Sequence, residues 1–125
     1  MARGLPTDLV AFIQTRLGSV WALELMLTLM ADSSRCWTAA EITRELRANE
    51  TLIAGLLERF QSSGLVARNE DGAWQWHPAN PEIGELAGRT AKAHGVTPFA
   101  VIQALADAPS RSLHDFANSF RLRKD

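Results

Sequence analysis

The sequence predicts a mainly helical domain with one small β-hairpin, and three observations support this fold class. Apolar residues recur every three or four positions over most of the 125 residues, as on the buried faces of helices. Cap residues and prolines precede these stretches, and glycines follow several of them. Two short alternating stretches flank an Asp-Gly pair, which favours a hairpin turn. With 46% hydrophobic and 22% charged residues, residues 1–125 are expected to form one domain around one core.

Two helices are predicted in the first quarter of the chain. Pro6 suits the first turn of a helix that runs to Leu17. Gly18 is expected to end that helix, and Ser19 to cap the next one. The stretch Val20–Ala31 is apolar on almost every side, which indicates a helix buried centrally among the others.

A second pair of helices is predicted after a polar turn. The pair Cys36-Trp37 should form a short extended piece with a single strand bridge, and its cysteine is expected to be buried. The segment Thr38-Ala39-Ala40-Glu41 is a capping box that opens a helix to about Arg47. After a tight turn, Asn49 caps a further helix, whose buried face carries Leu52, Ile53, Leu56, Leu57 and Phe60.

A hairpin should follow this helix. Gly64 ends the helix, and residues 65–68 alternate as a strand. The segment Asn69-Glu70-Asp71-Gly72 then turns the chain, because Asp and Gly tolerate positive φ. Residues 73–77 return as the partner strand, with Trp74 and Trp76 on the face that covers the core.

The remaining chain is predicted to be helical. Asn80-Pro81 opens a helix to about His94, which Gly95 should close. Thr97-Pro98 opens another helix, which ends near Asp107. A last amphipathic stretch, capped by Ser110 or Ser112, carries Leu113, Phe116, Ala117 and Phe120.

From Val20 to His77 the predicted order is helix, short strand, capped helix, tight turn, helix, strand, turn and strand. This order resembles the winged helix-turn-helix domains of bacterial transcriptional regulators. The likeness is carried by Trp37-Thr38-Ala39-Ala40-Glu41-Ile42, Asn49–Phe60, Ser63-Gly64-Leu65-Val66 and the hairpin around Asp71-Gly72. It implies a winged helix-turn-helix core at 19–78, about half of the chain. The helical pattern of the remaining residues predicts a C-terminal helical extension at 80–125.

The resemblance implies a small DNA-binding transcriptional regulator that acts as a homodimer. In such domains the second helix of the pair lies in the major groove of double-stranded DNA, and the wing touches phosphate or the minor groove. Carried onto this chain, the recognition helix is Asn49 to Ser62 and the wing is Asn69 to Ala73. The implied DNA-contacting positions are Asn49, Glu50, Thr51, Ala54, Gly55, Glu58, Arg59, Ser62 and Arg68.

The charge of this region favours an alternative. Between Thr38 and Gly72 four arginines stand against six carboxylates, a balance of -2, and the whole chain carries -1. Because Lys and Arg supply most of the non-specific affinity for DNA, such a monomer should bind weakly. The alternative is a winged-helix protein–protein interaction module that docks a protein partner without binding DNA.

Further candidate phosphate contacts lie at the end of the first helix of the pair and at the end of the chain. They are Arg44, Arg47, Arg121, Arg123 and Lys124. The tail has a second explanation, since basic residues commonly compensate the dipole at the end of a helix. Convergence of these side chains on one side would favour DNA binding, and scattered placement would favour protein docking.

Catalytic and metal sites are not expected. The sequence has no glycine-rich phosphate loop, nucleophile elbow or paired-carboxylate arrangement, so we predict neither enzymatic activity nor a cofactor. Cys36 is the only cysteine, and His77, His94 and His114 lie in separate elements without a suitably spaced partner.

The predicted location is cytoplasmic. A single cysteine fits a reducing compartment, and the first residues lack the apolar core of a signal peptide. The longest apolar stretch, Val20–Ala31, is too short to cross a bilayer, so no membrane contact is expected.

Overall fold

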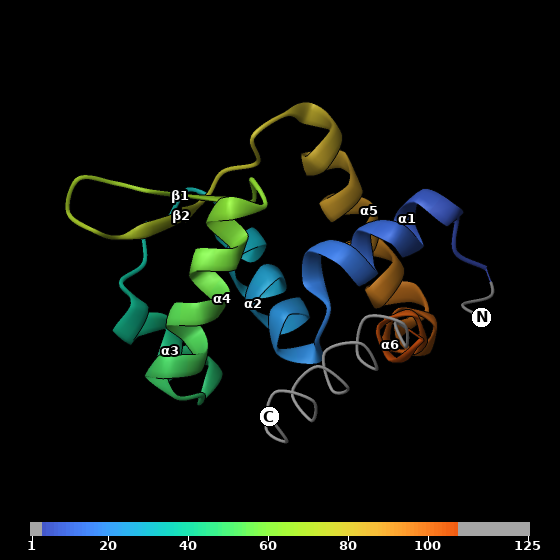
Figure 1. The fold of residues 1–125 in the computed structure, drawn as a ribbon, viewed down its shortest axis with the longest axis horizontal. Coiled ribbons are helices and arrows are strands. Elements are labelled where there is room, and N and C mark those ends of the chain that lie inside the picture. The colour runs from blue at the N-terminus through green and yellow to red at the C-terminus, as the bar shows by residue number, and fades with distance from the viewer. Residues whose placement is uncertain (1–3, 108–125) are drawn as a thin grey trace, which may run out of the picture.

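The structure, a computed structural model, describes residues 4–107 (Figure 1). The predicted last amphipathic stretch and the charged end of the chain lie outside these residues. In chain order the elements are α1 (Thr7–Phe12), the π-helical turn η1 (Ile13–Leu17), α2 (Val20–Ala31), α3 (Ala39–Leu46), α4 (Glu50–Ser62), β1 (Val66–Arg68), β2 (Trp74–Trp76), α5 (Pro81–Val96) and α6 (Pro98–Ala106).

Helix α2 lies between two groups of elements (Figure 1). It contacts α3 and β2 on one side and η1 on the other, while α1, η1, α5 and α6 pack together beyond it. Its side chains Leu23, Leu25, Met26 and Leu29 are fully buried. The predicted fold class is confirmed: the chain forms a winged helix-turn-helix core with additional helices after it.

The elbow before α2 forms as predicted. Gly18 adopts φ 78°, and its amide donates to the carbonyl of Ile13 at 2.9 Å, which closes the π-helical turn. The Ser19 hydroxyl then accepts a hydrogen bond from the Ala22 amide at 3.1 Å and caps α2. The predicted helix from Pro6 to Leu17 is therefore correct in extent, although its last five residues are wound as η1.

Helix α2 departs from one expectation. It was expected to be buried on almost every side, but Val20 and Trp21 in its first turn are 48% and 42% exposed. The first turn lies at the elbow with η1, and one side of it faces solvent. Periodicity cannot show this, because an all-round apolar pattern does not indicate which side lacks a neighbour.

The two helices after α2 begin as the cap residues predict. Thr38 and Glu41 form the capping box, with amide-to-side-chain distances of 2.9 and 3.1 Å. Arg47 ends α3 in a left-handed conformation, φ 54°, and the Ala48 amide donates to the Thr43 carbonyl at 3.1 Å. The Asn49 side chain then accepts from the Leu52 amide at 2.8 Å and opens α4.

The wing is a two-stranded antiparallel hairpin in which Val66 pairs with Trp76 and Arg68 with Trp74. Its turn has four residues. Gly72 takes φ 83° and donates to the Asn69 carbonyl at 3.0 Å, and the Asn69 side chain accepts from the amides of Asp71 and Ala73 at 2.9 Å each. The Asp-Gly pair predicted the turn correctly, and Asn69 completes it as a local acceptor.

The predicted strand bridge at Trp37 is confirmed. Trp37 and Trp74 exchange two backbone hydrogen bonds of 2.7 Å each, which attaches the wing to the segment before α3. Trp37 is buried, so the neighbouring Cys36 points the other way and is exposed. The expected burial of Cys36 is therefore wrong, because successive side chains of an extended segment alternate.

Helix α5 runs two residues beyond its predicted end. Gly95 was expected to close the helix, but α5 continues to Val96. Thr97 ends it with φ -135° and ψ 71°, since the ring of Pro98 disfavours a helical conformation in the preceding residue. The proline, rather than the glycine, is the stop signal here.

The cap of α3 yields a stability prediction. Thr38→Ala removes the hydroxyl that accepts the Glu41 amide, and it should cost roughly 1 kcal/mol of unfolding free energy in urea titrations. The matched control is Thr97→Ala. Thr97 occupies the same position before α6 but makes no side-chain cap bond there. Its hydroxyl donates only to the Ala93 carbonyl at 3.2 Å in an exposed position, so the loss should be smaller. Equal losses would contradict the role given to the Thr38 hydroxyl.

The same cap predicts a pH dependence. The hydrogen bond from the Thr38 backbone amide, with Arg35 nearby, holds the pKa of Glu41 below its ordinary value of 4.5. Because the folded pKa is the lower one, this stabilisation is present above pH 4.5 and is lost as the pH falls through the folded value. Glu41→Gln keeps an acceptor that does not titrate, so unfolding free energies measured from pH 6 to about pH 3 should fall less steeply than in the wild type. Parallel curves would refute this.

Candidate nucleic-acid interface

The outward face of α4 contains the positions that the sequence assigns to a recognition helix. Ile53, Leu56, Leu57 and Phe60 are buried against the core, and Leu52 is half-buried. All of the assigned residues are exposed: Asn49, Glu50, Thr51, Ala54, Gly55, Glu58, Arg59 and Ser62. The helix is thus oriented as the apolar spacing predicts.

The middle of this face is narrow and smooth. Thr51 and Ala54 have small side chains, and a Cβ added to Gly55 would meet no atom within 4 Å. Two carboxylates, Glu50 and Glu58, stand on the same ridge as Ala54, because residues four apart lie above one another on a helix. The centre of the face allows close approach of another molecule, while its ridge carries negative charge.

The end of α4 is set by Gly64. Its φ is 78°, and the amide of Leu65 donates to the Phe60 carbonyl at 2.8 Å. A Cβ at this glycine would lie 2.9 Å from the Cβ of Ala79, in the segment that leads into α5. The absence of a side chain at Gly64 therefore lets the end of α4 pack closely against the segment that follows the wing.

Two candidate phosphate-binding arginines are exposed at the end of α3. Arg44 lies in the last turn, and Arg47 is the only non-glycine residue with positive φ in the described part of the chain. A left-handed conformation costs a side-chain-bearing residue roughly 1–2 kcal/mol, and helices usually place glycine there. Arg47 bears this backbone energy cost, and its guanidinium lies at the tight turn between α3 and α4.

Two other candidate arginines bind within the protein. Arg59 donates to the carbonyl of Leu17, at the end of η1, over 3.5 Å. Close by, Arg16 of η1 donates to the carbonyl of Ser63, just after α4. In the wing, Arg68 donates to the Gly72 carbonyl at 3.3 Å and lies 4.9 Å above the ring of Trp74. These side chains do not converge with Arg44 and Arg47, whereas convergence would favour DNA binding.

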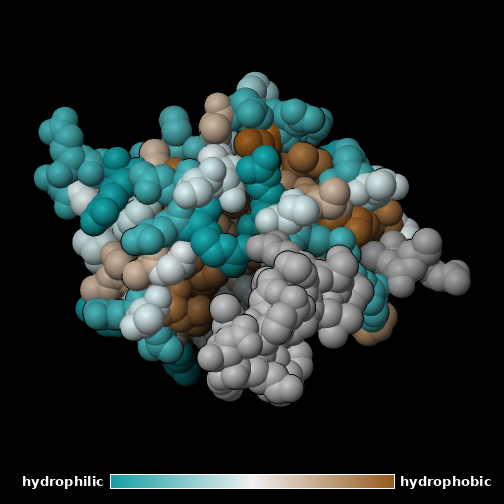
Figure 2. Space-filling model, in the orientation of Figure 1, coloured by the Kyte–Doolittle hydropathy of each residue, from teal (hydrophilic) through white to brown (hydrophobic). Residues whose placement is uncertain are grey.

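The wing tip is acidic. Glu70 and Asp71 are exposed at the turn, and Figure 2 shows this end of the molecule as hydrophilic.

The two tryptophans of the second strand face the core as predicted. Trp74 is buried, and Trp76 packs partly buried against the core. Bases or a ligand therefore have no stacking surface on Trp74.

Arg35 is a charged residue that the sequence analysis did not select. Its guanidinium lies 3.6 Å from the centre of the Trp37 ring and 3.9 Å from a carboxylate oxygen of Glu41. The sequence holds one signal for this contact. Arg35 stands two positions before Trp37 on an extended segment, and alternate side chains of such a segment share a face. Arg121, Arg123 and Lys124 lie outside the described residues.

Between residues 4 and 107, no three His, Cys, Asp or Glu side chains are grouped so as to hold a metal ion. In the same span, no single helix combines the length and apolar composition needed to cross a membrane, although the bent pair Thr7–Leu17 and Val20–Ala31 meets the test by length and composition.

Two solved structures resemble this chain. One is a variant of ZitR from Lactococcus lactis, at 17% identity and a TM-score of 0.43, covering 81% of this chain and 73% of its own. The other is the MarR family protein Rv2887 of Mycobacterium tuberculosis in complex with salicylic acid, at 19% identity and a TM-score of 0.44, covering 97% and 98%. No protein-family model and no curated protein matches the sequence.

Proposed function

We propose that this protein is a winged-helix, DNA-binding transcriptional regulator that acts as a homodimer in the cytoplasm. The observation that carries the proposal is the exposed face of α4. Its small residues Thr51, Ala54 and Gly55 leave room for the helix to enter a major groove, and Arg44 and Arg47 stand beside its first turn.

The conformation of Arg47 supports this proposal. Glycine at this position would relieve the backbone strain, so a side chain here calls for an explanation outside stability. A guanidinium that contacts a phosphate next to the recognition helix is such an explanation. Helix-dipole compensation contributes about 0.3–1 kcal/mol, which does not exceed the cost of the left-handed conformation.

A second copy would offset the weak charge of one copy. Each phosphate contact is duplicated in a dimer with two-fold symmetry, so the electrostatic part of the affinity doubles. Two apolar side chains near the junction of α5 and α6, Val96 and Phe99, are 72% and 76% exposed. This apolar surface, on the opposite side of α2 from α4, supports association there while α4 stays accessible (Figure 1).

A protein-docking role is the second candidate. The balance of -2 between Thr38 and Gly72 favours it, as do the acidic wing tip and the internal contacts of Arg59 and Arg68. In this case the exposed face of α4 would contact a protein partner instead of DNA. A purified sample that binds a protein partner and retards no duplex would favour this candidate.

DNA binding is tested by gel retardation of genomic duplex fragments at low salt. The wild type should bind, and its affinity should fall steeply with salt, by a log–log slope of about 0.9 for each neutralised phosphate. Gly55→Glu should abolish binding, because it places a charged side chain on the groove-facing surface, while raising helix propensity.

The matched control is Gly88→Glu on α5, where an added Cβ also meets no atom within 4 Å. It adds the same charge away from α4 and should retain binding. The DNA proposal fails if the wild type retards no duplex, or if both glutamate variants bind as the wild type does.

Arg47→Gly should separate stability from function. Removing the strained side chain should leave the unfolding free energy unchanged or raise it by up to about 1 kcal/mol. DNA affinity should fall, and the salt slope should drop by about one for each phosphate that the variant no longer neutralises. Arg47→Lys keeps the charge and should retain most of the binding. A glycine variant with unaltered affinity and salt slope would remove Arg47 from the interface.

A further inference from the structure

One side of α2 faces outward along the length of the helix and is largely apolar. Val20 and Trp21 are exposed in its first turn, and Glu24, Leu27 and Ala31 follow Val20 at spacings of four, three and four residues. Side chains at these spacings share one face of a helix. Leu27 is half-buried and Ala31 is exposed, so this surface, called here the α2 face, stays open to its last residue.

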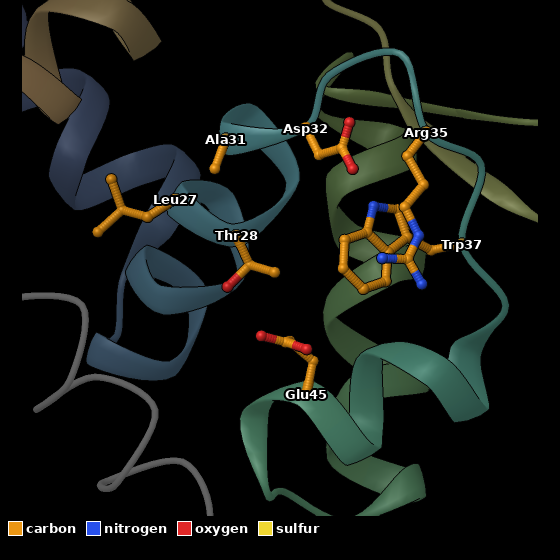
Figure 3. A pocket seen from close by; sticks show the side chains of 7 residues that line it. All are labelled: Leu27, Thr28, Ala31, Asp32, Arg35, Trp37 and Glu45. Atoms are coloured by element: carbon orange, nitrogen blue, oxygen red, sulfur yellow. The ribbon is translucent and has the colours of Figure 1, made fainter.

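The α2 face leads into a hollow between α2 and α3 (Figure 3). Leu27 and Ala31 line the hollow from α2, while Asp32 and Glu45 stand on its two sides. Both carboxylates are exposed, and neither belongs to an ion pair within the described part of the chain. The apolar face thus ends next to two negative charges.

The described chain ends beside the start of the α2 face. The Gln14 side chain of η1 donates to the carbonyls of Ala104 and Asp107 at 3.0 and 3.1 Å, which holds the end of α6 against η1. Gly18 ends η1, and α2 begins two residues later at an angle of 100° to the helix before it. The residues after Asp107 therefore leave the described fold close to the first turn of α2.

The sequence after Asp107 fits the α2 face in pattern and in length. Its apolar residues at positions 113, 116, 117 and 120 recur as they do on one side of a helix. Residues 110–121 number twelve, as do the residues of α2, so a helix formed by them would also extend over about 18 Å.

The charges of the two parts are opposite. Residues 4–107 hold 8 Lys and Arg against 12 Asp and Glu, a balance of -4, whereas residues 108–125 hold 4 against 2, a balance of +2. Three of the four cations gather near the end of the chain, at positions 121, 123 and 124. A segment that runs along α2 from its first turn to its last brings these cations to Asp32 and Glu45.

We propose that residues 110–121 dock as an amphipathic helix on the α2 face of their own chain. Phe116 and Phe120 belong to the apolar side of this helix, which covers the exposed Val20 and Trp21. The basic end of the segment lies at the hollow, where Asp32 and Glu45 have no other cationic partner among the described residues.

The occupant is the segment of the same chain rather than that of a second copy. A short tether keeps the segment at an effective concentration in roughly the millimolar range, far above that of other molecules in a dilute sample. The other exposed apolar pair, Val96 and Phe99, lies at the junction of α5 and α6 and remains available for association between copies. The docking needs no DNA, so it does not rest on the proposed function.

Coverage of Trp21 is tested by NMR on the full chain. The indole N–H signal of Trp21 is assigned by its loss in Trp21→Phe, and a soluble nitroxide serves as the probe because it broadens exposed protons. The signal should be protected in the wild type. Phe116→Glu should weaken docking by about tenfold or more, since burying a carboxylate against an indole is costly, and should expose the Trp21 signal.

A matched control makes the same exchange on the other apolar surface. Phe99→Glu should leave the Trp21 signal protected, whereas Phe120→Glu should expose it as Phe116→Glu does. Unchanged indole signals of the buried Trp37 and Trp74 show that each variant keeps its core.

The direction of the segment is tested from Cys36, the only cysteine, which is exposed and lies between two residues that line the hollow. A nitroxide attached to its thiol should broaden the amide signals of residues 121–124 in the same molecule. Glu45→Lys should reduce this broadening about twofold, and Glu70→Lys at the wing tip should not. In a mixture of isotope-labelled chains without nitroxide and unlabelled chains that carry it, the signals should stay sharp.

Three results would overturn the proposal or part of it. Docking fails if Trp21 is as accessible in the wild type as in Phe116→Glu. Docking within one chain fails if the mixed sample shows the broadening, because the segment then comes from a second copy. Equal effects of Glu45→Lys and Glu70→Lys would overturn the placement of the basic end at the hollow.

Discussion

The paired backbone hydrogen bonds between Trp37 and Trp74 are the interaction on which the arrangement of this domain depends. Each is 2.7 Å long, and together they join the segment before α3 to the second strand of the wing. The two residues are 37 positions apart in the chain, so the bridge closes a loop that contains α3, α4 and β1. Because the Trp37 and Trp74 side chains are also buried, the bridge attaches the wing to the core at this point.

A second junction connects this loop to the remaining helices. Arg16 of η1 donates to the carbonyl after α4, and Arg59 of α4 donates to the last carbonyl of η1. Both acceptors are carbonyls at helix ends, where the backbone lacks intrahelical donors and the helix dipole favours a cation. The exit of α4 is thereby held to the elbow before α2, and a movement of α4 would have to break or carry both contacts.

Local signals in the sequence predicted most of the fold. Ser19, Thr38 and Asn49 each start a helix by the side-chain bond that their residue type favours. The exposure of side chains whose burial depends on tertiary neighbours could not be predicted in the same way. The exposure of Trp21 depends on which side of α2 lacks a neighbour, and the exposure of Cys36 on the direction fixed by the Trp37 bridge. In the candidate site, the periodicity of apolar residues predicted which side chains of α4 are exposed. It did not predict the hydrogen-bond acceptors of Arg59 and Arg68, since a long side chain can reach several acceptors from one backbone position.

These internal contacts of the arginines bear on the choice between DNA and protein as partner. The hydrogen bond from the exposed Arg59 side chain to the Leu17 carbonyl is 3.5 Å long. Arg68 combines a 3.3 Å hydrogen bond to Gly72 with a cation–π contact to Trp74, which contributes about 0.5–1 kcal/mol at an exposed site. A charge-assisted hydrogen bond to phosphate contributes about 1.5–3 kcal/mol, so a duplex could draw either side chain away. The internal contacts therefore weigh less against DNA binding than the carboxylates do. Glu50 and Glu58 stand on the exposed ridge of α4 itself. In the proposed complex with DNA their repulsion must be offset by Arg44, Arg47 and a second copy.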